Sequence, residues 1–453
     1  MHGLCRIAVR LVATLALVAT AGEARAENLR DAWSIALAIN PQLLASRQTS
    51  VSAGQELASS RAVRLPQIQT LNGQAFLTNP ISVPSSSGQP KAAPNGQEQF
   101  TISAVAAIVP LYTGGRTQNT IASNRAQLSA LQADEMTAAL DLKLQVARAY
   151  VDVLRANRGV VVARSSVASL SAQARDVKNL VTQGRGIRND LLAAQVARAN
   201  AQQRAIQAGN RLNIAWATYN RYLCRPMDTV VPLEELAQEP PALARGEHSD
   251  QDPLMQDVEP VTPDETEIRA LVDAAMQNRS ELASLSEQSR STRAQAAAAR
   301  AGTRPQVSFL AANLYQNARF LPTEADTGAA AFVLNWTLFD GGKARRHAMA
   351  LEQRAAADLS RRDDLAAGIK LQVRSAWLIC QENQRRIPIT RAAVVQAEEN
   401  LRVARSRYLQ QRGTNTEVLD AESARVQSYD NYFNALYDAI LADFELRRAI
   451  GVM

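Results

Sequence analysis

The sequence predicts a mainly α-helical protein with a small β part, built from a duplicated unit that carries long antiparallel coiled-coil hairpins. Three observations predict this fold class. Two long tracts almost without proline are rich in helix-forming residues, and the prolines gather in the zones between them. Two of these zones contain stretches that alternate apolar with smaller or polar residues, as β-strands do. The second half of the chain also repeats the first half at a constant offset.

The first 26 residues have the pattern of a secretory signal peptide. Arg6 and Arg10 precede an apolar run at 11–21, and residues 24–26 (Ala-Arg-Ala) have the small-x-small form of a cleavage site. We therefore expect the mature chain to begin near Glu27. No later run of 18 apolar residues occurs, so the sequence predicts no transmembrane helix, and a membrane crossing would need a β-barrel.

Neither motifs nor composition favour an enzyme, a metal site or a nucleic-acid partner. An exported enzyme is a second rival to the function proposed below, but the sequence has no Gly-x-Ser-x-Gly motif, metal constellation or isolated acid pair to support it. The chain of 453 residues interleaves 50 basic with 43 acidic residues, and its net charge of +7 is a mild imbalance. His248 and His347 lie about a hundred residues apart, without the three or four ligands that zinc requires, so we expect no metal and no cofactor. Cys224 and Cys380 are expected to be two free buried thiols in helices, with one disulfide as the alternative.

Each of the two long tracts predicts a helical hairpin. Interior proline costs a helix about 3 kcal/mol; the tract at 115–225 has none, and the tract at 343–450 has only Pro388. Both tracts are far longer than a globular helix. Each has a turn signal near its middle, at 184–186 (Gly-Arg-Gly) and 412–414 (Arg-Gly-Thr).

Two further zones predict pairs of strands. Residues 98–111 and 329–339 alternate with a period of two over the length that a membrane strand needs, and candidate partners with poorer alternation precede them at 66–78 and 305–316. Four strands cannot close a barrel, because the smallest barrels have about eight. The chain therefore has either an open sheet with exposed edges or a barrel shared by several chains, and three chains would give twelve strands.

A shift of 227 residues superimposes the two halves without a gap over about 80 residues. It places Leu-Tyr-Thr-Gly-Gly at 111–115 over Leu-Phe-Asp-Gly-Gly at 338–342, and Lys-Leu-Gln-Val at 143–146 over the same tetrapeptide at 370–373. The predicted organisation is a signal peptide at 1–26, a first repeat at 27–226, a linker at 227–266 and a second repeat at 267–453.

These residues resemble the TolC family of outer-membrane efflux and secretion channels over almost the whole mature chain. The marks are the duplicated Leu-aromatic-x-Gly-Gly and the turn segments 186–192 and 413–421. The resemblance implies a homotrimer, in which long hairpins form a periplasmic α-barrel joined to a shared 12-stranded transmembrane β-barrel. It also implies localisation in the bacterial outer membrane, contact with its lipid, and two partners: a periplasmic adaptor protein and an inner-membrane transporter of the ABC or resistance–nodulation–division type.

By the same resemblance the chain is a passive conduit with an acidic gate at its periplasmic end. Asp420 and Glu417 fall on gate positions of the family, and Asp190 falls on an aspartate that helps to latch the closed state. Three copies of each gate residue would favour cations. The alternative is that Glu417 and Asp420 are ordinary first-turn acids, which the helix dipole favours.

The turn residues depart in part from the family pattern. The family's latch tyrosine and arginine positions hold Gln410 and Asn415 here, and Tyr408 is displaced by two residues. We therefore expect the closed state to be held differently or more weakly.

Two further groups of residues are candidates for specific roles. Those expected to contact the adaptor or pump are Arg185, Gly186, Arg412 and Gly413, although arginines beside a turn can also be merely solvated. Those expected to form hinges, where strand becomes helix, are Gly114, Gly115, Gly341 and Gly342, because glycine adopts left-handed backbone angles cheaply.

The alternative to a channel is a periplasmic coiled-coil adaptor protein, which is also exported and helical. Adaptors usually carry one hairpin and an inner-membrane anchor, whereas this sequence carries two hairpins and no anchor. The sequence does not identify the cargo, which could be a drug, a metal ion or a secreted protein. Since Cys5 precedes the apolar run and is badly placed for lipid attachment, type I secretion and multipurpose export are slightly favoured.

Overall fold

The computed structural model describes residues 26–77, 98–236, 262–318 and 325–453. The predicted signal peptide up to residue 25 and much of the predicted linker therefore lie outside the described residues. The chain divides into two compact units. We call Met1–Leu44, Thr137–Arg279 and Gly368–Met453 the hairpin unit, and Ala45–Met136 and Ser280–Ala367 the sheet unit.

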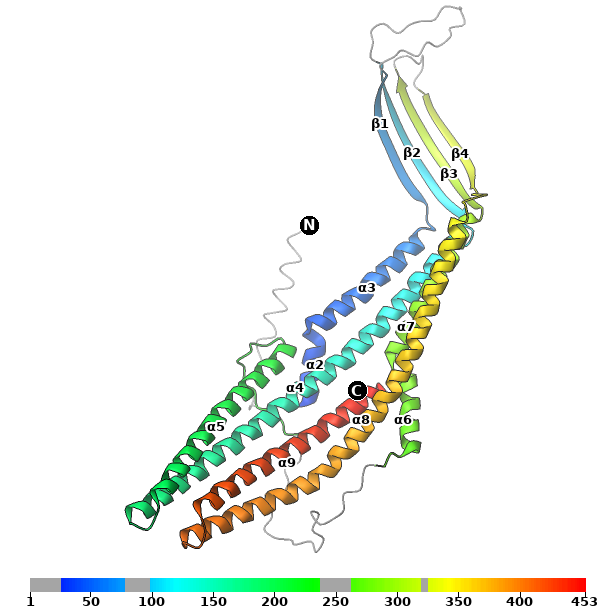
Figure 1. The fold of residues 1–453 in the computed structure, drawn as a ribbon. Helices are drawn as coiled ribbons and strands as arrows, with labels where there is room; N and C mark the ends of the chain where they lie inside the picture. The colour runs from blue at the N-terminus through cyan, green and yellow to red at the C-terminus, as the bar shows by residue number, and fades with distance from the viewer. Residues whose placement is uncertain (1–25, 78–97, 237–261, 319–324) are drawn as a thin grey trace, which may run out of the picture. The chain divides into compact units, whose positions relative to one another are not determined.

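The hairpin unit contains two antiparallel helical hairpins (Figure 1). The first is formed by α4 (Arg116–Thr182) and α5 (Arg188–Tyr222), and the second by α8 (Lys343–Leu409) and α9 (Asn415–Ile450). Both α4 and α8 have 67 residues, which is about 100 Å at 1.5 Å per residue. Residues 116–136 of α4 and 343–367 of α8 belong to the sheet unit. Pro388 lies inside α8 without ending it.

The core of the hairpin unit also fixes the start of the expected mature chain. Tyr150 of α4 and Tyr219 of α5 are fully buried. The Tyr219 hydroxyl donates to Glu27 Oε1 (3.0 Å), and the Tyr150 hydroxyl lies 2.8 Å from the Glu27 carbonyl oxygen. Arg225 donates to both carboxylate oxygens of Glu27 (2.7 and 3.2 Å). Two short helices, α2 (Leu29–Ile39) and α6 (Glu265–Asn278), complete this unit.

The sheet unit holds most of α3 (Pro41–Ala62), all of α7 (Ser280–Arg300) and a four-stranded antiparallel sheet. The strands pair in the order β1-β2-β3-β4. Their bounds are β1 (Gln67–Leu77), β2 (Glu98–Tyr112), β3 (Gln306–Ala318) and β4 (Ala325–Asn335). Because every neighbouring pair is antiparallel, the four junctions between strand and helix lie at the same end of the strands (Figure 1). We call this the helix-proximal end of the sheet.

The larger apolar side chains of β2 and those of β4 lie on opposite faces of the sheet. Ile108 of β2 pairs with Leu310 of β3, whereas Phe332 of β4 pairs with Phe309 of β3. Paired residues share a face and successive residues point to opposite faces. The apolar side of β2 therefore lies on one face and that of β4 on the other, so neither face is uniformly apolar.

Strand β4 is displaced from its predicted position at 329–339 and ends at Asn335. Asn335 pairs with Gln306, the first residue of β3, so no partner strand continues beyond it. Trp336 lies just past the end of β4, and its Nε1 donates to the Thr303 carbonyl (3.1 Å), which precedes β3. The alternation of apolar residues runs past the point at which backbone pairing stops.

Both described cysteines are free thiols. Cys380 is buried in α8, and burial raises the pKa of its thiol. Cys224 follows the end of α5, where it is exposed and has a left-handed φ of 51°. The expectation of two buried helical thiols is therefore wrong for Cys224, because α5 ends at Tyr222.

The predicted fold class is confirmed: the chain is mainly helical, with a small antiparallel sheet and a unit of helix, two strands and helical hairpin that occurs twice. Among the described residues, no helix is both long enough and apolar enough to cross a membrane.

Candidate functional site

The tip of the first hairpin joins α4 to α5. Gly184 has a left-handed φ of 71°. Gly186 packs so closely on the end of α4 that a Cβ atom there would lie 2.8 Å from the Val181 backbone nitrogen. Ile187 precedes α5 without a side-chain cap. Glycine at both positions is therefore a requirement of the backbone, which is a structural role that does not exclude contact with a partner.

The tip of the second hairpin joins α8 to α9 with different side chains. Gln411, and not a glycine, has the left-handed φ of 60°. A Cβ atom on Gly413 would lie 3.0 Å from Glu417 Oε2 and 3.2 Å from Arg407 Cβ. Thr414 caps α9 by accepting a hydrogen bond from the Glu417 backbone N–H (3.3 Å). This tip is therefore fixed by side-chain contacts as well as by backbone geometry.

Asp190, at the start of α5, links the first hairpin to the second. The Tyr408 hydroxyl donates to Asp190 Oδ2 (3.3 Å), and Asn415 Nδ2 donates to the Asp190 carbonyl (3.2 Å). Asn415 is buried and accepts a hydrogen bond from Gln173 Nε2 of α4 (3.0 Å). Burial, together with the Asp190 carboxylate, raises the pKa of Tyr408 to about 12. The start of α9 is thus bonded to both helices of the first hairpin.

These contacts change the interpretation of the departures from the family pattern. Tyr408, although displaced in the sequence, reaches Asp190, and Asn415 is one of the linking residues. Gln410, at the expected tyrosine position just past the end of α8, donates through its side chain to Ser406 Oγ of α8 (3.1 Å). Within the chain the two hairpins are therefore linked by Tyr408, Asn415 and Gln173, and how the closed state is held stays a prediction. The sequence offered no signal for Gln173, which lies nine residues before the end of α4.

The two predicted gate acids lie on the exposed side of α9. Glu417 is exposed, and its carboxylate lies 3.9 Å from Arg407 Nη1. Asp420 is exposed and makes no ion pair or hydrogen bond with the other described residues. Arg185 and Arg412 are also exposed. These charged groups remain available to a ligand, a partner or a second copy of the chain.

A buried ion pair above the tip was missed by the sequence analysis. Glu422 and Arg425 of α9 are 2% and 9% exposed, and Arg425 Nη2 lies 2.8 Å from Glu422 Oε1. Ser169 of α4 donates to Glu422 Oε2 (2.8 Å), and Arg405 of α8 donates to Ser169 Oγ (3.0 Å). The pair therefore joins the two hairpins. Its only sequence signal is an acid and a base three residues apart, which is common on solvated helices.

The four predicted hinge glycines all have left-handed φ values, between 64° and 91°. Their surroundings differ between the repeats. A Cβ atom on Gly114 would lie 2.7 Å from Arg304 Cβ, whereas nothing lies within 4 Å of the same position on Gly341. Asp340 accepts hydrogen bonds from the backbone N–H groups of Gly342 and Ala344 (both 2.8 Å), and these bonds lower the pKa of its carboxyl.

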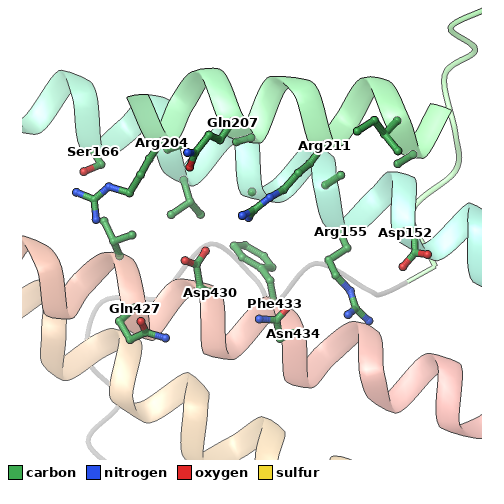
Figure 2. Close-up of a pocket in the computed structure, with 18 of the residues that line it drawn as sticks. Asp152, Arg155, Ser166, Arg204, Gln207, Arg211, Gln427, Asp430, Phe433 and Asn434 are labelled. Carbon is green, nitrogen blue, oxygen red and sulfur yellow. The ribbon is translucent and has the colours of Figure 1, made fainter. Parts of the chain in front are cut away.

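A groove of about 680 Å³ lies between α4, α5 and α9 in the hairpin unit (Figure 2). Arg204 and Arg211 of α5 and Asp430 of α9 point into it (Figure 2). Burial raises the pKa of Asp430, and the two arginines offset part of the rise. Asp152 and Arg155 also line the groove, and Arg155 is paired with Asp438 (2.7 Å). Two acids therefore face the two remaining arginines, and the lining does not select one sign of ligand charge. No group of three or more metal-ligating side chains occurs in the part of the chain that the structure describes.

Comparisons with known proteins agree with this architecture. A family model described as outer membrane efflux protein matches residues 32–223 and 271–452. A search of curated proteins found no match.

Solved structures of outer-membrane proteins share the fold at low sequence identity. VceC from Vibrio cholerae is 17% identical, with a TM-score of 0.75 over 94% of this chain and 96% of that chain. The CmeC channel from Campylobacter jejuni is 13% identical, with a TM-score of 0.77 over 94% and 86%. The open state of the MtrE channel from Neisseria gonorrhoeae is 16% identical, with a TM-score of 0.72 over 94% and 89%. Since the family model covers most of its length, the chain belongs to the outer membrane efflux protein family.

Proposed function

We propose that three copies of this chain form a channel that gives passive exit across the periplasm and outer membrane, for a tripartite efflux pump or a type I secretion system. Membership of the family, whose members are outer-membrane transport channels, supports the channel and its localisation. The four-stranded sheet supports a barrel shared by three chains, because β1 and β4 are each paired on one side only among the described strands. The adaptor alternative is not favoured by the family match.

The observation that carries the gate is the arrangement of acids at the hairpin tips. Asp190 is bonded to the second hairpin through Tyr408 and Asn415, which supports a role in holding the closed state. Glu417 and Asp420 are exposed. Three copies of each, gathered around one axis, would form a ring of negative charge that attracts cations and repels anions.

The tips are also the proposed contact surface for the periplasmic adaptor and the inner-membrane transporter. Arg185 and Arg412 are exposed beside the two turns and have no ion pair with the described residues. Their guanidinium groups can donate to carbonyl or carboxylate oxygens of a partner helix. In this scheme the transporter supplies the energy, and this chain supplies a pore that opens when the tips separate.

The channel and its gate can be tested by conductance in planar bilayers. The mature protein should form cation-preferring pores, and the double variant Glu417→Gln, Asp420→Asn should lose most of that preference and conduct more. A control variant, Glu382→Gln with Asp228→Asn, removes two exposed acids away from the tips and should behave as the wild type. Unchanged ion selectivity in the tip variant would contradict the gate, and absence of pores from the wild type would contradict the channel.

A further inference from the structure

Positive charge is concentrated at the helix-proximal end of the sheet, where the four strands meet helices. The antiparallel register brings the starts of β1 and β3 and the ends of β2 and β4 together at this end, as Gln67 pairs with Ile108 and Gln306 with Asn335. Residues 60–66, 113–119, 299–305 and 339–347 flank the four junctions. They hold eight Lys or Arg residues and one acid, a formal charge of +7 that equals the net charge of the whole chain.

Most of this charge is not neutralised by the residues that the structure describes. Six of the eight basic residues are exposed and make no side-chain ion pair or hydrogen bond with other described residues: Arg61, Arg64, Arg116, Lys343, Arg345 and Arg346. We call these six the basic belt. Of the other two, Arg300 pairs with Glu352, and Arg304 donates to the Gly114 carbonyl. The single acid, Asp340, is occupied with backbone N–H groups at the start of α8.

Large apolar side chains are exposed at the same end of the sheet, next to the basic belt. Phe339 is 87% exposed and Leu338 is 79% exposed. The others that lie within a few residues of the junctions are Val63, Leu65, Leu111, Tyr112 and Trp336. We call these seven residues the collar. Aromatic side chains with a polar group, such as Tyr112 and Trp336, are typical of the boundary between lipid tails and water.

We propose that the basic belt binds the headgroups of anionic phospholipids in the membrane leaflet that surrounds the helix-proximal end of the sheet. The inference rests on the proposed function, in which the strands cross the outer membrane. The collar would then lie among the outer parts of the lipid tails, and the belt would lie at the depth of the phosphates. Arginine suits this role, because its planar guanidinium donates two parallel hydrogen bonds to one phosphate group.

The collar distinguishes a lipid surface from a soluble polyanion or an acidic protein segment. A soluble polyanion needs only the positive charge, and it would leave seven large apolar side chains in contact with water. A membrane accounts for both features at once. It also accounts for their order along the chain: Leu338 and Phe339, in the loop after β4, come before Lys343, Arg345 and Arg346, in the first turn of α8. The apolar residues therefore lie nearer to the strand along the chain.

The test compares lipid preference in the wild type and in two charge variants. The belt variant replaces all six belt residues by glutamine. The control variant replaces six exposed basic residues of α4 and α5 by glutamine: Arg164, Arg175, Lys178, Arg198, Arg204 and Arg221. Each protein is placed in bilayers of phosphatidylcholine with about one third phosphatidylglycerol, and the lipids that stay bound after extraction are measured by native mass spectrometry.

We expect the wild type and the control variant to retain phosphatidylglycerol over phosphatidylcholine by roughly tenfold or more. The belt variant should retain the two lipids in proportion to their supply. Rising salt should weaken the wild-type preference, since the contacts are electrostatic and exposed. If the belt variant fails to fold, the double variant Arg345→Gln, Arg346→Gln should show an intermediate loss.

Two results would overturn the proposal: equal lipid retention by the wild type, or an undiminished preference in the belt variant. Pore conductance in bilayers of phosphatidylcholine alone distinguishes failure of the lipid proposal from failure of the proposed channel function. A wild type that conducts but shows no lipid preference contradicts only the belt, whereas a wild type that never conducts contradicts the channel itself.

Discussion

The two hairpin tips occupy equivalent places in the duplicated unit, yet their acids differ in surroundings. The shift of 227 residues places Asp190 over Glu417. Asp190 is half-buried and accepts a hydrogen bond from Tyr408, whereas Glu417 is exposed. The position equivalent to Tyr408 holds Val181, which has no hydroxyl to donate. Duplication therefore preserved the length and turn of the hairpins, while single side chains decided which acid is bonded and which is exposed.

The second helices of the two hairpins differ in the same way. The buried pair Glu422 and Arg425 of α9 is equivalent to Gln195 and Arg198 of α5, and both α5 residues are exposed. A base at the same place in the repeat is thus buried against the other hairpin in α9 and is solvated in α5. The comparison makes the first hairpin a matched control for the second.

The largest expected effect comes from breaking the buried pair. Arg425→Met would leave the Glu422 carboxylate buried without its cation, so the free energy of unfolding should fall by about 3–5 kcal/mol. Arg198→Met, at the equivalent exposed position, should change it by less than about 0.5 kcal/mol. Denaturant unfolding of both variants in detergent, followed by helical circular dichroism, measures the difference. Equal effects would mean that the pair does not hold the hairpins together.

The glycines at the junctions between strand and helix offer a second comparison between the repeats. Gly341→Ala should cost about 1–2 kcal/mol, because alanine is strained at a φ of 66° although space is open around it. Gly114→Ala should cost about 1–3 kcal/mol more, since its Cβ would lie 2.7 Å from Arg304 Cβ. The midpoints of thermal unfolding of the two variants test the order. A larger loss for Gly341→Ala would contradict the role of packing at the first junction.

The smallest expected effect concerns the Tyr408–Asp190 bond, which the first hairpin cannot duplicate. The folded-state pKa of Tyr408, about 12, lies above its ordinary value of 10.0. The bond therefore contributes fully below pH 10 and is lost as the pH rises through about 12. Tyr408→Phe should lose about 1 kcal/mol at neutral pH, and the gap to the wild type should close in that alkaline window. Tyr222→Phe, which removes a hydroxyl with no hydrogen bond among the described residues, is the control; a gap that does not change with pH would argue against the bond.

The sequence by itself determined the architecture of this protein. Helices of 67 residues, the turns near 184 and 413, and the repeat of the whole unit follow from proline placement, glycine placement and self-similarity. These features are recognised from the residue types along the chain, so they can be predicted without knowing any tertiary contact. The glycines at the junctions belong to the same class, because a left-handed backbone angle is a property of one residue.

Only the tertiary structure decided which side chains meet. Tyr408 reaches Asp190 across 218 residues of sequence, and the Glu422–Arg425 pair is buried because α4 covers it. The basic belt is drawn from three short segments that do not stand out in a chain of interleaved charges, and they meet only because the strands alternate in direction. The physical reason is the same in each case. Burial, hydrogen bonding and charge density depend on distances in space, which the spacing of residues along one chain does not specify.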